Sequence, residues 1–160
     1  ITERFSNIGS KPKLEYIDLL KLIYKSIDYL KKRSSSKIIF IVESTVKSVK
    51  VKINKELLGW AIENICKNSI DAVGEKGSIK IKVDSKKNKL LIDITDNGKG
   101  IEKNQFINIF NPGISTKKRG WGLGLSLTKR IIEEYHNGKI FVLKSLKGIE
   151  TTLRIVLPKM

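Results

Sequence analysis

Two repeating patterns of apolar residues predict the helices and strands of this chain. Apolar positions recur every three or four residues over residues 12–32, as on the buried face of a helix, at Leu14, Ile17, Leu20, Tyr24, Ile27 and Leu30. The same spacing predicts helices over residues 54–73 and 123–135. Alternating or β-branched apolar residues predict strands over residues 38–42, 49–53, 79–83, 90–94, 140–143 and 151–157.

The order of these elements indicates the fold class. After residue 37 the order is two strands, a helix, two strands, a long loop, a helix and two strands. Consecutive strands joined by short turns favour antiparallel pairing. We therefore expect an α+β two-layer sandwich, with a mixed, mostly antiparallel sheet and the helices on one of its faces. The loop over residues 102–122 is too long for a simple connection and is expected to be a lid or a binding loop.

Composition narrows the choice of partner and compartment. The formal net charge is +16, but the basic residues are spread along the whole sequence. No zinc-finger spacing or aromatic RNA-binding motif accompanies them, so we expect no nucleic-acid partner and keep a basic nucleic-acid-binding module as an alternative. No apolar run approaches the roughly 20 residues that cross a bilayer. The single cysteine, Cys66, is expected in the core and fits a reducing compartment, so the domain is expected in the cytoplasm.

Three polar side chains share one stripe of the helix predicted over residues 54–73. At about 100° per residue, Asn64, Asn68 and Asp71 lie within about 60° of one another, opposite a broad apolar face. An amide oxygen suits a hard cation such as Mg²⁺, which also binds phosphate oxygens. A solvated polar stripe would explain any one of these residues alone, and two glycine-rich segments argue against that simpler explanation.

The first of these segments follows the strand predicted over residues 90–94. Asp96, at the strand end, can accept a hydrogen bond from an exocyclic amine, which distinguishes adenine from guanine. A hydrogen bond to a charged group is worth about 1.5–3 kcal/mol, enough for useful base selectivity. Gly98 and Gly100 leave room for a purine beside the backbone and permit positive φ before Ile101. Alone, this segment would be an ordinary turn.

The second segment, which contains Gly120, Gly122 and Gly124, leads directly into a predicted helix. Backbone N–H groups at a helix N-terminus bind anions, which suggests phosphate contacts. Polar and cationic side chains precede the glycines, namely Thr116, Lys117, Lys118 and Arg119. Apolar residues expected to anchor the lid are Phe110 and Ile114. Together the two segments predict a nucleotide held by its base at one end and by its phosphates at the other.

The combined segments resemble the catalytic domain of sensor histidine kinases. Four motifs occur in the family's order, namely the N box at residues 64–72, the first glycine box at residues 96–101, the F box at residues 106–110 and the second glycine box at residues 120–125. The resemblance extends from about residue 37 to the end of the chain. It implies the Bergerat ATP-binding fold, which is shared with DNA gyrase, Hsp90 and the mismatch-repair ATPases.

The resemblance also implies ATP and Mg²⁺ as ligands. By position in the motifs, Asn68 would bind Mg²⁺ and Asn64 would lie near the phosphates, so both are expected catalytic positions. Asp96 would read adenine, and Thr151, which follows a third glycine motif, would lie near the base. The other expected nucleotide contacts are Asp71, Gly98, Gly100, Ile101, Phe110, Thr116, Lys117, Arg119, Gly120, Gly122, Leu123, Gly124 and Leu125.

The sequence departs from the family pattern at two positions. Glu150 stands where the family commonly has glycine, and the third glycine box is therefore degenerate. Asp71 stands where many members have a lysine or arginine. Another cation would have to supply the phosphate contact made there, and the candidates are Lys67, Lys117 and Arg119.

The implied activity is transfer of the γ-phosphate of ATP to a histidine on a dimerisation domain, with a response-regulator receiver domain as a further partner. No match to the family's phosphoacceptor box is found, and His136 is expected to be structural, at a helix end where protonation would suit the dipole. Residues 1–36 resemble the end of the dimerisation hairpin and its linker, which leaves residues 37–160 as the catalytic domain. The start at Ile1 suggests a fragment of a longer, homodimeric protein, whether or not that protein is anchored in a membrane.

Two alternatives belong to the same fold. An ATPase of this fold would place a glutamate where this chain has Asn64, because a carboxylate can activate water and an amide cannot. A serine kinase of the anti-sigma type differs mainly in the protein that docks against it, and the hairpin-like residues 1–33 argue against it.

Overall fold

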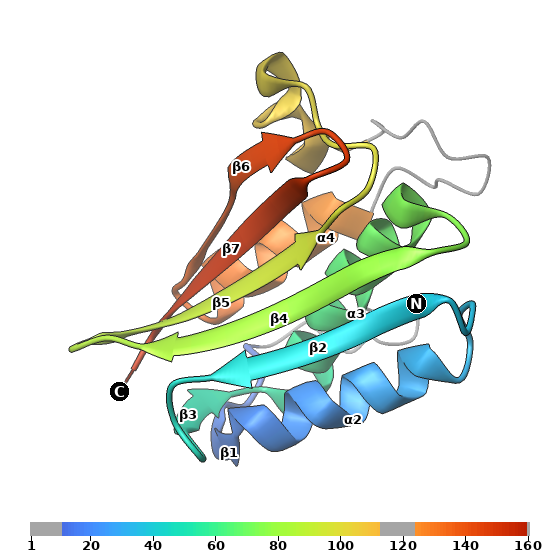
Figure 1. Cartoon of the computed structure of the whole chain (residues 1–160). Coiled ribbons are helices and arrows are strands. Elements are labelled where there is room, and N and C mark those ends of the chain that lie inside the picture. The colour runs from blue at the N-terminus through green and yellow to red at the C-terminus, as the bar shows by residue number, and fades with distance from the viewer. Residues whose placement is uncertain (1–10, 113–123, 160) are drawn as a thin grey trace.

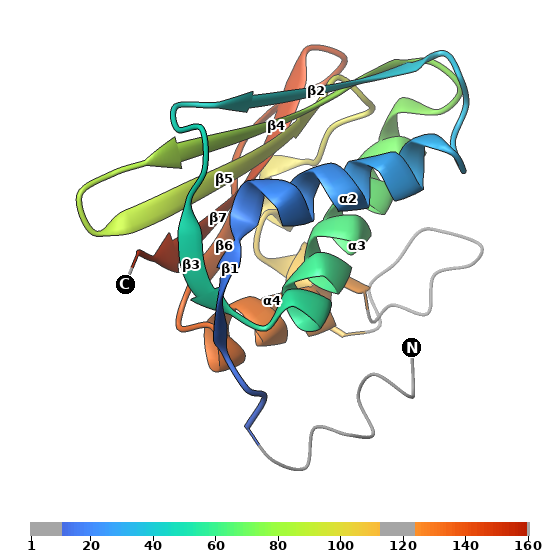
Figure 2. The ribbon, with the colours of Figure 1, turned by 90° about the horizontal axis from the view of Figure 1, so that it is seen from below.

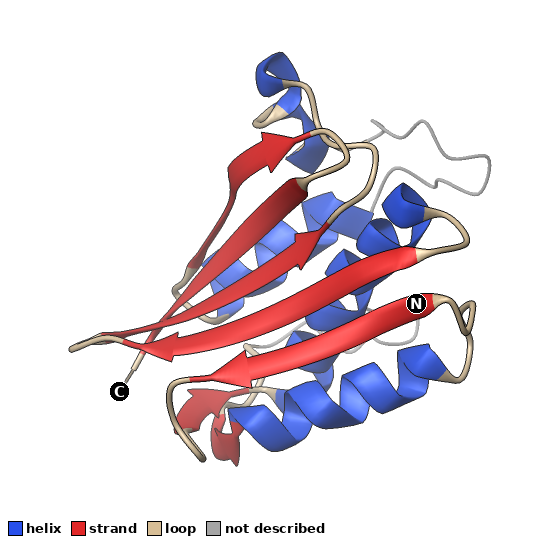
Figure 3. Cartoon of the chain, viewed as in Figure 1, coloured by secondary structure: helices blue, strands red, loops and turns tan. Residues whose placement is uncertain are grey.

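The computed structural model describes residues 11–112 and 124–159, in which helices pack against one face of a sheet (Figure 1). The sheet contains, in spatial order, β2 (Ile38–Ser44), β4 (Gly77–Ser85), β5 (Lys89–Asp96), β7 (Glu150–Pro158) and β6 (Lys139–Leu146). The helical layer contains α2 (Leu19–Lys31), α3 (Lys55–Val73) and α4 (Gly124–Arg130), which continues as a π-helical turn, η3 (Ile131–Tyr135). Figure 3 shows these two layers, and the predicted α+β sandwich is confirmed. No helix within the described ranges is long and apolar enough to cross a bilayer.

The sheet is mixed, as predicted, because β2 runs parallel to β4 while the other neighbours pair antiparallel. Parallel neighbours require a crossover connection, and here the chain passes through β3 (Lys50–Ile53) and α3 before it returns as β4. Strands β2 and β3 do not pair with each other, so the expectation that consecutive strands pair antiparallel is wrong for these two. Strand β3 pairs instead with β1 (Glu15–Asp18), in a separate two-stranded sheet.

The first helix begins later than its apolar spacing predicts. Residues 15–18 form β1, in which Ile17 lies opposite Val51 of β3. Asp18 then caps α2, and its Oδ1 accepts the N–H of Leu20 at 3.1 Å. The prediction of one helix over residues 12–32 is therefore wrong over residues 12–18, about its first two turns. Pairing with a strand more than 30 residues away along the sequence prevails here over a local spacing that fits a helix.

Helix α2 packs into the same core as α3 and the sheet (Figure 2). The shared apolar cluster includes Leu19, Ile23 and Ile27 of α2, Leu58, Ile62, Ile65 and Cys66 of α3, and Ile79, Ile81, Ile92, Ile94 and Ile155 of the sheet. Burial of one such aliphatic side chain contributes about 1.5–3 kcal/mol. Residues before and after the boundary expected at residue 36 therefore contribute to one apolar core. Cys66 lies in the core as predicted, and burial raises the pKa of its thiol to about 12.

His136 joins the end of η3 to the start of α3 as a neutral ring. Its Nδ1–H donates to the carbonyl oxygen of Ile131 at 2.9 Å, and its Nε2 accepts the N–H of Asn54 at 3.1 Å. These two partners require the tautomer that carries its proton on Nδ1. The structural role predicted for His136 is confirmed, but the role is performed by a buried neutral imidazole rather than by a cation at a helix end.

We expect the protein to lose stability as the pH falls below about 6.5, the ordinary pKa of histidine. Burial lowers the pKa of His136 in the folded chain, so the unfolded chain binds this proton first. The free energy of unfolding should therefore fall with pH, by at most about 1.4 kcal/mol per pH unit for one proton. Urea unfolding at a series of pH values measures this slope. The His136→Gln variant should have a flatter profile, and equal slopes for the two proteins would contradict this role of His136.

Candidate nucleotide-binding site

The predicted polar stripe lies along one side of α3 (Lys55–Val73). Asn54 caps this helix as predicted, with its Oδ1 accepting the N–H of Leu57 at 3.0 Å. Asn64 and Asn68 are half-buried and Asp71 is exposed. The opposite side carries the buried residues Leu58, Ile62, Ile65 and Cys66. The core therefore fixes the rotation of α3, and this rotation presents the two amides and the carboxylate together.

Asn64 connects the stripe to the first turn of α4. Its Nδ2 donates to the hydroxyl oxygen of Thr128 at 3.0 Å, and that hydroxyl donates to the carbonyl oxygen of Gly124 at 2.7 Å. A β-carbon at position 124 would lie only 2.7 Å from Asn64 Nδ2, so a larger residue there would displace the Asn64 amide. The start of α4, which contains the last residues of the second glycine box, is thereby held directly against the N box.

Asp96 is a buried carboxylate at the end of β5. Only 5% of the residue is exposed, and its Oδ1 accepts the N–H of Gly98 at 2.9 Å. Burial raises the pKa of this carboxyl, while hydrogen bonds from the Gly98 N–H and the Ser69 hydroxyl oppose the rise. A buried carboxylate is costly unless it is hydrogen-bonded, and these two hydrogen bonds offset part of that cost. Ser69 lies on α3, so Asp96 and the polar stripe belong to one continuous region.

The glycines after Asp96 let the loop close over the end of α3. A β-carbon at position 98 would lie 2.5 Å from the carbonyl carbon and oxygen of Ala72, and the N–H of Lys99 donates to that oxygen at 3.0 Å. Gly98 is thus required by packing against the helix, a reason that the sequence did not reveal. Gly100 has φ of +80°, which confirms the expected need for positive φ in this segment.

The far end of the same loop contacts the hairpin of β6 and β7. Thr151 lies opposite Asp96 in the register of β5 and β7, and it is buried. Its hydroxyl is hydrogen-bonded to that of Ser145 at 2.8 Å, and Ser145 Oγ also accepts the N–H of Ile101 at 2.8 Å. Glu150, which stands where the family commonly has glycine, forms an ion pair with Lys144 at 2.6 Å beside these contacts.

Phe110 of the F box and Leu125 of α4 both pack against the apolar core. Two short 3₁₀ turns follow the glycine box, η1 (Lys103–Gln105) and η2 (Asn108–Phe110). Phe110 ends the second turn, and only 6% of this residue is exposed. The ammonium of Lys129 lies 5.6 Å from the centre of its ring. Leu125 is half-buried against the same core. Phe110 therefore anchors the described part of the long loop. The remaining predicted site residues lie outside the described residues, namely Ile114, Thr116, Lys117, Arg119, Gly120, Gly122 and Leu123.

Three hydroxyl residues that complete the site were missed from the sequence, namely Ser69, Thr128 and Ser145. Thr128 could have been found, because it lies one helical turn after Gly124 and can donate to its carbonyl oxygen. Ser69 follows Asn68 directly, on the side of α3 that faces the core. Ser145 lies beyond the strand predicted over residues 140–143, and its partners come from two other segments, so no local pattern indicates its role.

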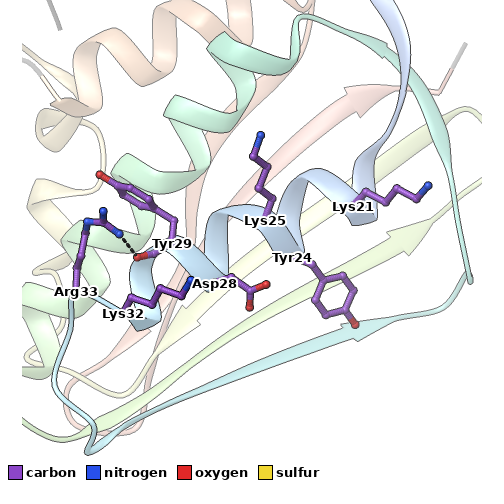
Figure 4. Close-up of a pocket in the computed structure, with 7 residues that line it drawn as sticks. All are labelled: Lys21, Tyr24, Lys25, Asp28, Tyr29, Lys32 and Arg33. Atoms are coloured by element: carbon purple, nitrogen blue, oxygen red, sulfur yellow. Dashed lines mark hydrogen bonds between the residues drawn. The ribbon is translucent and has the colours of Figure 1, made fainter.

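A separate hollow lies on the outward face of α2 and the turn after it (Figure 4). Its lining residues are Lys21, Tyr24, Lys25, Asp28, Tyr29, Lys32 and Arg33. The guanidinium of Arg33 stacks at 3.8 Å from the ring centre of Tyr29 and donates to that residue's carbonyl oxygen at 3.1 Å. All seven side chains come from one helix and its end, and none of the predicted nucleotide contacts is among them.

Comparison with known proteins agrees with this geometry. The family model described as histidine kinase-, DNA gyrase B-, and HSP90-like ATPase matches residues 53–160. The sensor histidine kinase ZraS of Salmonella typhimurium (strain LT2) is 33% identical over 149 residues, which cover 91% of this chain and 31% of ZraS. Sporulation kinase B of Bacillus subtilis (strain 168) is 34% identical over 142 residues, covering 88% of this chain and 33% of that kinase. The chain thus spans about a third of the length of these relatives.

Solved structures give the same result. The nucleotide-free catalytic domain of the histidine kinase ThkA superposes with a TM-score of 0.81 at 27% identity, covering 92% of this chain and 96% of that domain. ThkA has also been solved in complex with the response regulator protein TrrA, with a TM-score of 0.78 at 25% identity over 92% of this chain and 42% of that one. The chain belongs to the family of histidine kinase-, DNA gyrase B- and HSP90-like ATPases, and it is the catalytic ATP-binding domain of a two-component sensor histidine kinase.

Proposed function

We propose that the chain binds Mg-ATP between the polar side of α3 and the loop of residues 96–101, and that the γ-phosphate is passed to a histidine on a separate dimerisation domain. The observation that carries the proposal is the buried Asp96, fixed at a strand end beside the N-box helix. Asp96 would accept a hydrogen bond from the amino group of adenine. Thr151, its neighbour on the adjacent strand β7, would lie near the same base. Asn64, held against Gly124, would lie near the phosphates.

The polar side of α3 also fits a magnesium ion that is bound together with the nucleotide. The amide oxygen of Asn68 is a suitable ligand for this hard cation, which usually takes one or two protein oxygens and keeps several waters. Within the described residues, no group of three or more histidine, cysteine or carboxylate side chains forms a site that could bind a metal by itself. The ion would neutralise charge on the transferring phosphate, and Asn68 would hold it in place.

The residues near the proposed phosphate position favour phosphate transfer to another protein over hydrolysis. An enzyme that hydrolyses ATP needs a base to accept a proton from water. Asn64 is an amide and cannot accept that proton, and its Nδ2 is already engaged with Thr128. The chain would therefore bind the nucleotide, orient it and neutralise its charge. The acceptor histidine and its base would come from the dimerisation domain.

Partners follow from the same proposal. The dimerisation domain would present the acceptor histidine, and the parent protein would act as a homodimer. A response-regulator receiver domain would take the phosphate in the next step, as the complex of ThkA with TrrA suggests by analogy. The packing of α2 into the catalytic core supports a catalytic domain that begins near Glu15, ahead of the boundary expected from the sequence.

A labelling experiment tests the proposed transfer. With γ-labelled ATP and Mg²⁺, the chain alone should retain no label, because it lacks the acceptor histidine. The parent protein's dimerisation domain, added in trans, should become labelled with the acid-labile phosphate that is typical of phosphohistidine. Sustained phosphate release by the chain alone would favour an ATPase of the same fold. Failure to label the added domain, although ATP binds, would contradict the proposed transfer.

A further inference from the structure

The loop of the first glycine box contacts the β6–β7 hairpin at three positions, namely residues 98, 100 and 101. The carbonyl oxygen of Gly98 accepts the N–H of Gly148 at 2.8 Å. A β-carbon at Gly100 would lie 3.2 Å from both the Cα of Lys147 and the Oγ of Ser145. The N–H of Ile101 donates to Ser145 Oγ at 2.8 Å. The hairpin therefore helps to set the position of residues 98–101, together with the contacts of Gly98 and Lys99 with Ala72 of α3.

Ser145 also contacts the other side chain beside Asp96. Its Oγ lies 2.8 Å from the hydroxyl oxygen of Thr151, and Thr151 is the direct cross-strand neighbour of both Ser145 and Asp96. Asp96, Thr151 and Ser145 thus form a row across β5, β7 and β6. One hydroxyl group links the backbone at the end of the glycine loop to the side chain next to the buried carboxylate.

We propose that Ser145 is a positioning residue for base recognition, because its hydroxyl sets both the place of the glycine loop and the direction of the Thr151 hydroxyl. This inference rests on the proposed function, in which Asp96 and Thr151 meet the base. A hydroxyl has one proton and two lone pairs. One lone pair of Ser145 is used by the N–H of Ile101. When Ser145 donates its proton to Thr151, the proton of Thr151 is left to donate to the ligand.

This arrangement has a chemical consequence for the choice of base. An ionised Asp96 can only accept hydrogen bonds, and a Thr151 hydroxyl oriented by Ser145 presents a donor beside it. An acceptor next to a donor complements the edge of adenine, in which an amino group adjoins a ring nitrogen without a proton. The corresponding edge of guanine has a carbonyl oxygen beside a ring N–H, the reverse pattern. Ser145 would therefore contribute to selectivity for adenine without touching the nucleotide.

Three variants test this role in calorimetric titrations with MgATP and MgGTP. Ser145→Ala should weaken ATP binding about three- to tenfold, which corresponds to the free energy of one lost hydrogen bond. It should also lower the ratio of ATP affinity to GTP affinity. Ser145→Thr keeps the hydroxyl and should restore that ratio. Thr95→Val is the matched control, because it removes a similar hydroxyl pair, Thr95 with Thr152 at 2.7 Å, on the other face of β5 and β7. This control should leave the ratio unchanged.

Hydrogen exchange at the backbone N–H of Ile101 gives a second, ligand-free readout. This N–H should exchange faster in Ser145→Ala than in the wild-type chain, and Thr95→Val should not change it. An unchanged affinity ratio in Ser145→Ala would overturn the inference, as would an equal loss in Thr95→Val, which would indicate a general effect on stability. If the wild-type chain bound no ATP, the proposed function would fail, and with it the role in base selectivity. The exchange of Ile101 would then still show whether Ser145 holds the loop.

Discussion

Replacing Asp96 by asparagine is expected to weaken ATP binding at least about tenfold, because a hydrogen bond to a charged group is worth about 1.5–3 kcal/mol. The change keeps the size of the side chain and an oxygen that can accept the N–H of Gly98. It removes the charge and replaces one acceptor oxygen by a donor, which would face the amino group of adenine. Isothermal calorimetry of both proteins with MgATP measures the effect.

Asp93→Asn is the matched control for this substitution. Asp93 lies on the same strand, but its side chain points to the other face of the sheet. There its two carboxylate oxygens accept hydrogen bonds from the guanidinium of Arg154 at 2.7 and 2.8 Å. Removing that charge should lower the stability of the fold and leave ATP affinity close to that of the wild-type chain. Wild-type affinity in Asp96→Asn, or an equal loss in both variants, would contradict the role of Asp96 in reading the base.

Gly98→Ala should have the second large effect, on both stability and nucleotide binding. The added β-carbon would lie 2.5 Å from backbone atoms of Ala72, and a backbone cannot move aside as a side chain does. Overpacking of this kind costs about 1–3 kcal/mol or more. The displaced loop would carry with it the N–H that Asp96 accepts and the carbonyl oxygen that Gly148 contacts. We expect a lower free energy of unfolding in urea and no measurable ATP binding under conditions where the wild-type site saturates.

Gly59→Ala provides the comparison for this change. Position 59 lies within α3, and a β-carbon there would meet only the end of the Leu22 side chain, at 3.3 Å. Alanine is favoured over glycine in a helix by up to about 1 kcal/mol, so this variant should be as stable as the wild-type chain or slightly more stable. If Gly98→Ala behaved like Gly59→Ala, the close packing of the glycine loop against α3 would not be required.

The parts of the fold that depend on local pattern could be predicted from the sequence. The rotation of α3 follows from the spacing of Leu58, Ile62 and Ile65, and the position of Asp96 follows from the alternation that ends β5. Strand β1 could not be found in this way, because Ile17 also fits the spacing of the helix that follows. The capping residue Asp18 was the available signal for the true start of α2.

The same distinction between local pattern and tertiary contact applies to the residues of the site. Asn64, Asn68 and Asp96 could be assigned to the proposed site from the sequence, because each belongs to a motif with a fixed spacing. The contacts of Ser145 join segments about 45 residues apart in the sequence, and they depend on a strand register that no local pattern determines. The reason for Gly98 also depends on tertiary packing, because it lies in the backbone of Ala72 rather than in the turn itself.

Titration of the unaltered chain with MgATP and, separately, with MgGTP tests the proposed nucleotide site most directly. We expect a saturable heat from ATP at one site per chain, and a GTP affinity at least about tenfold weaker, since guanine presents a carbonyl oxygen to the Asp96 carboxylate. No saturable heat from ATP, or equal affinities for the two nucleotides, would contradict adenine recognition by the buried carboxylate at the end of β5.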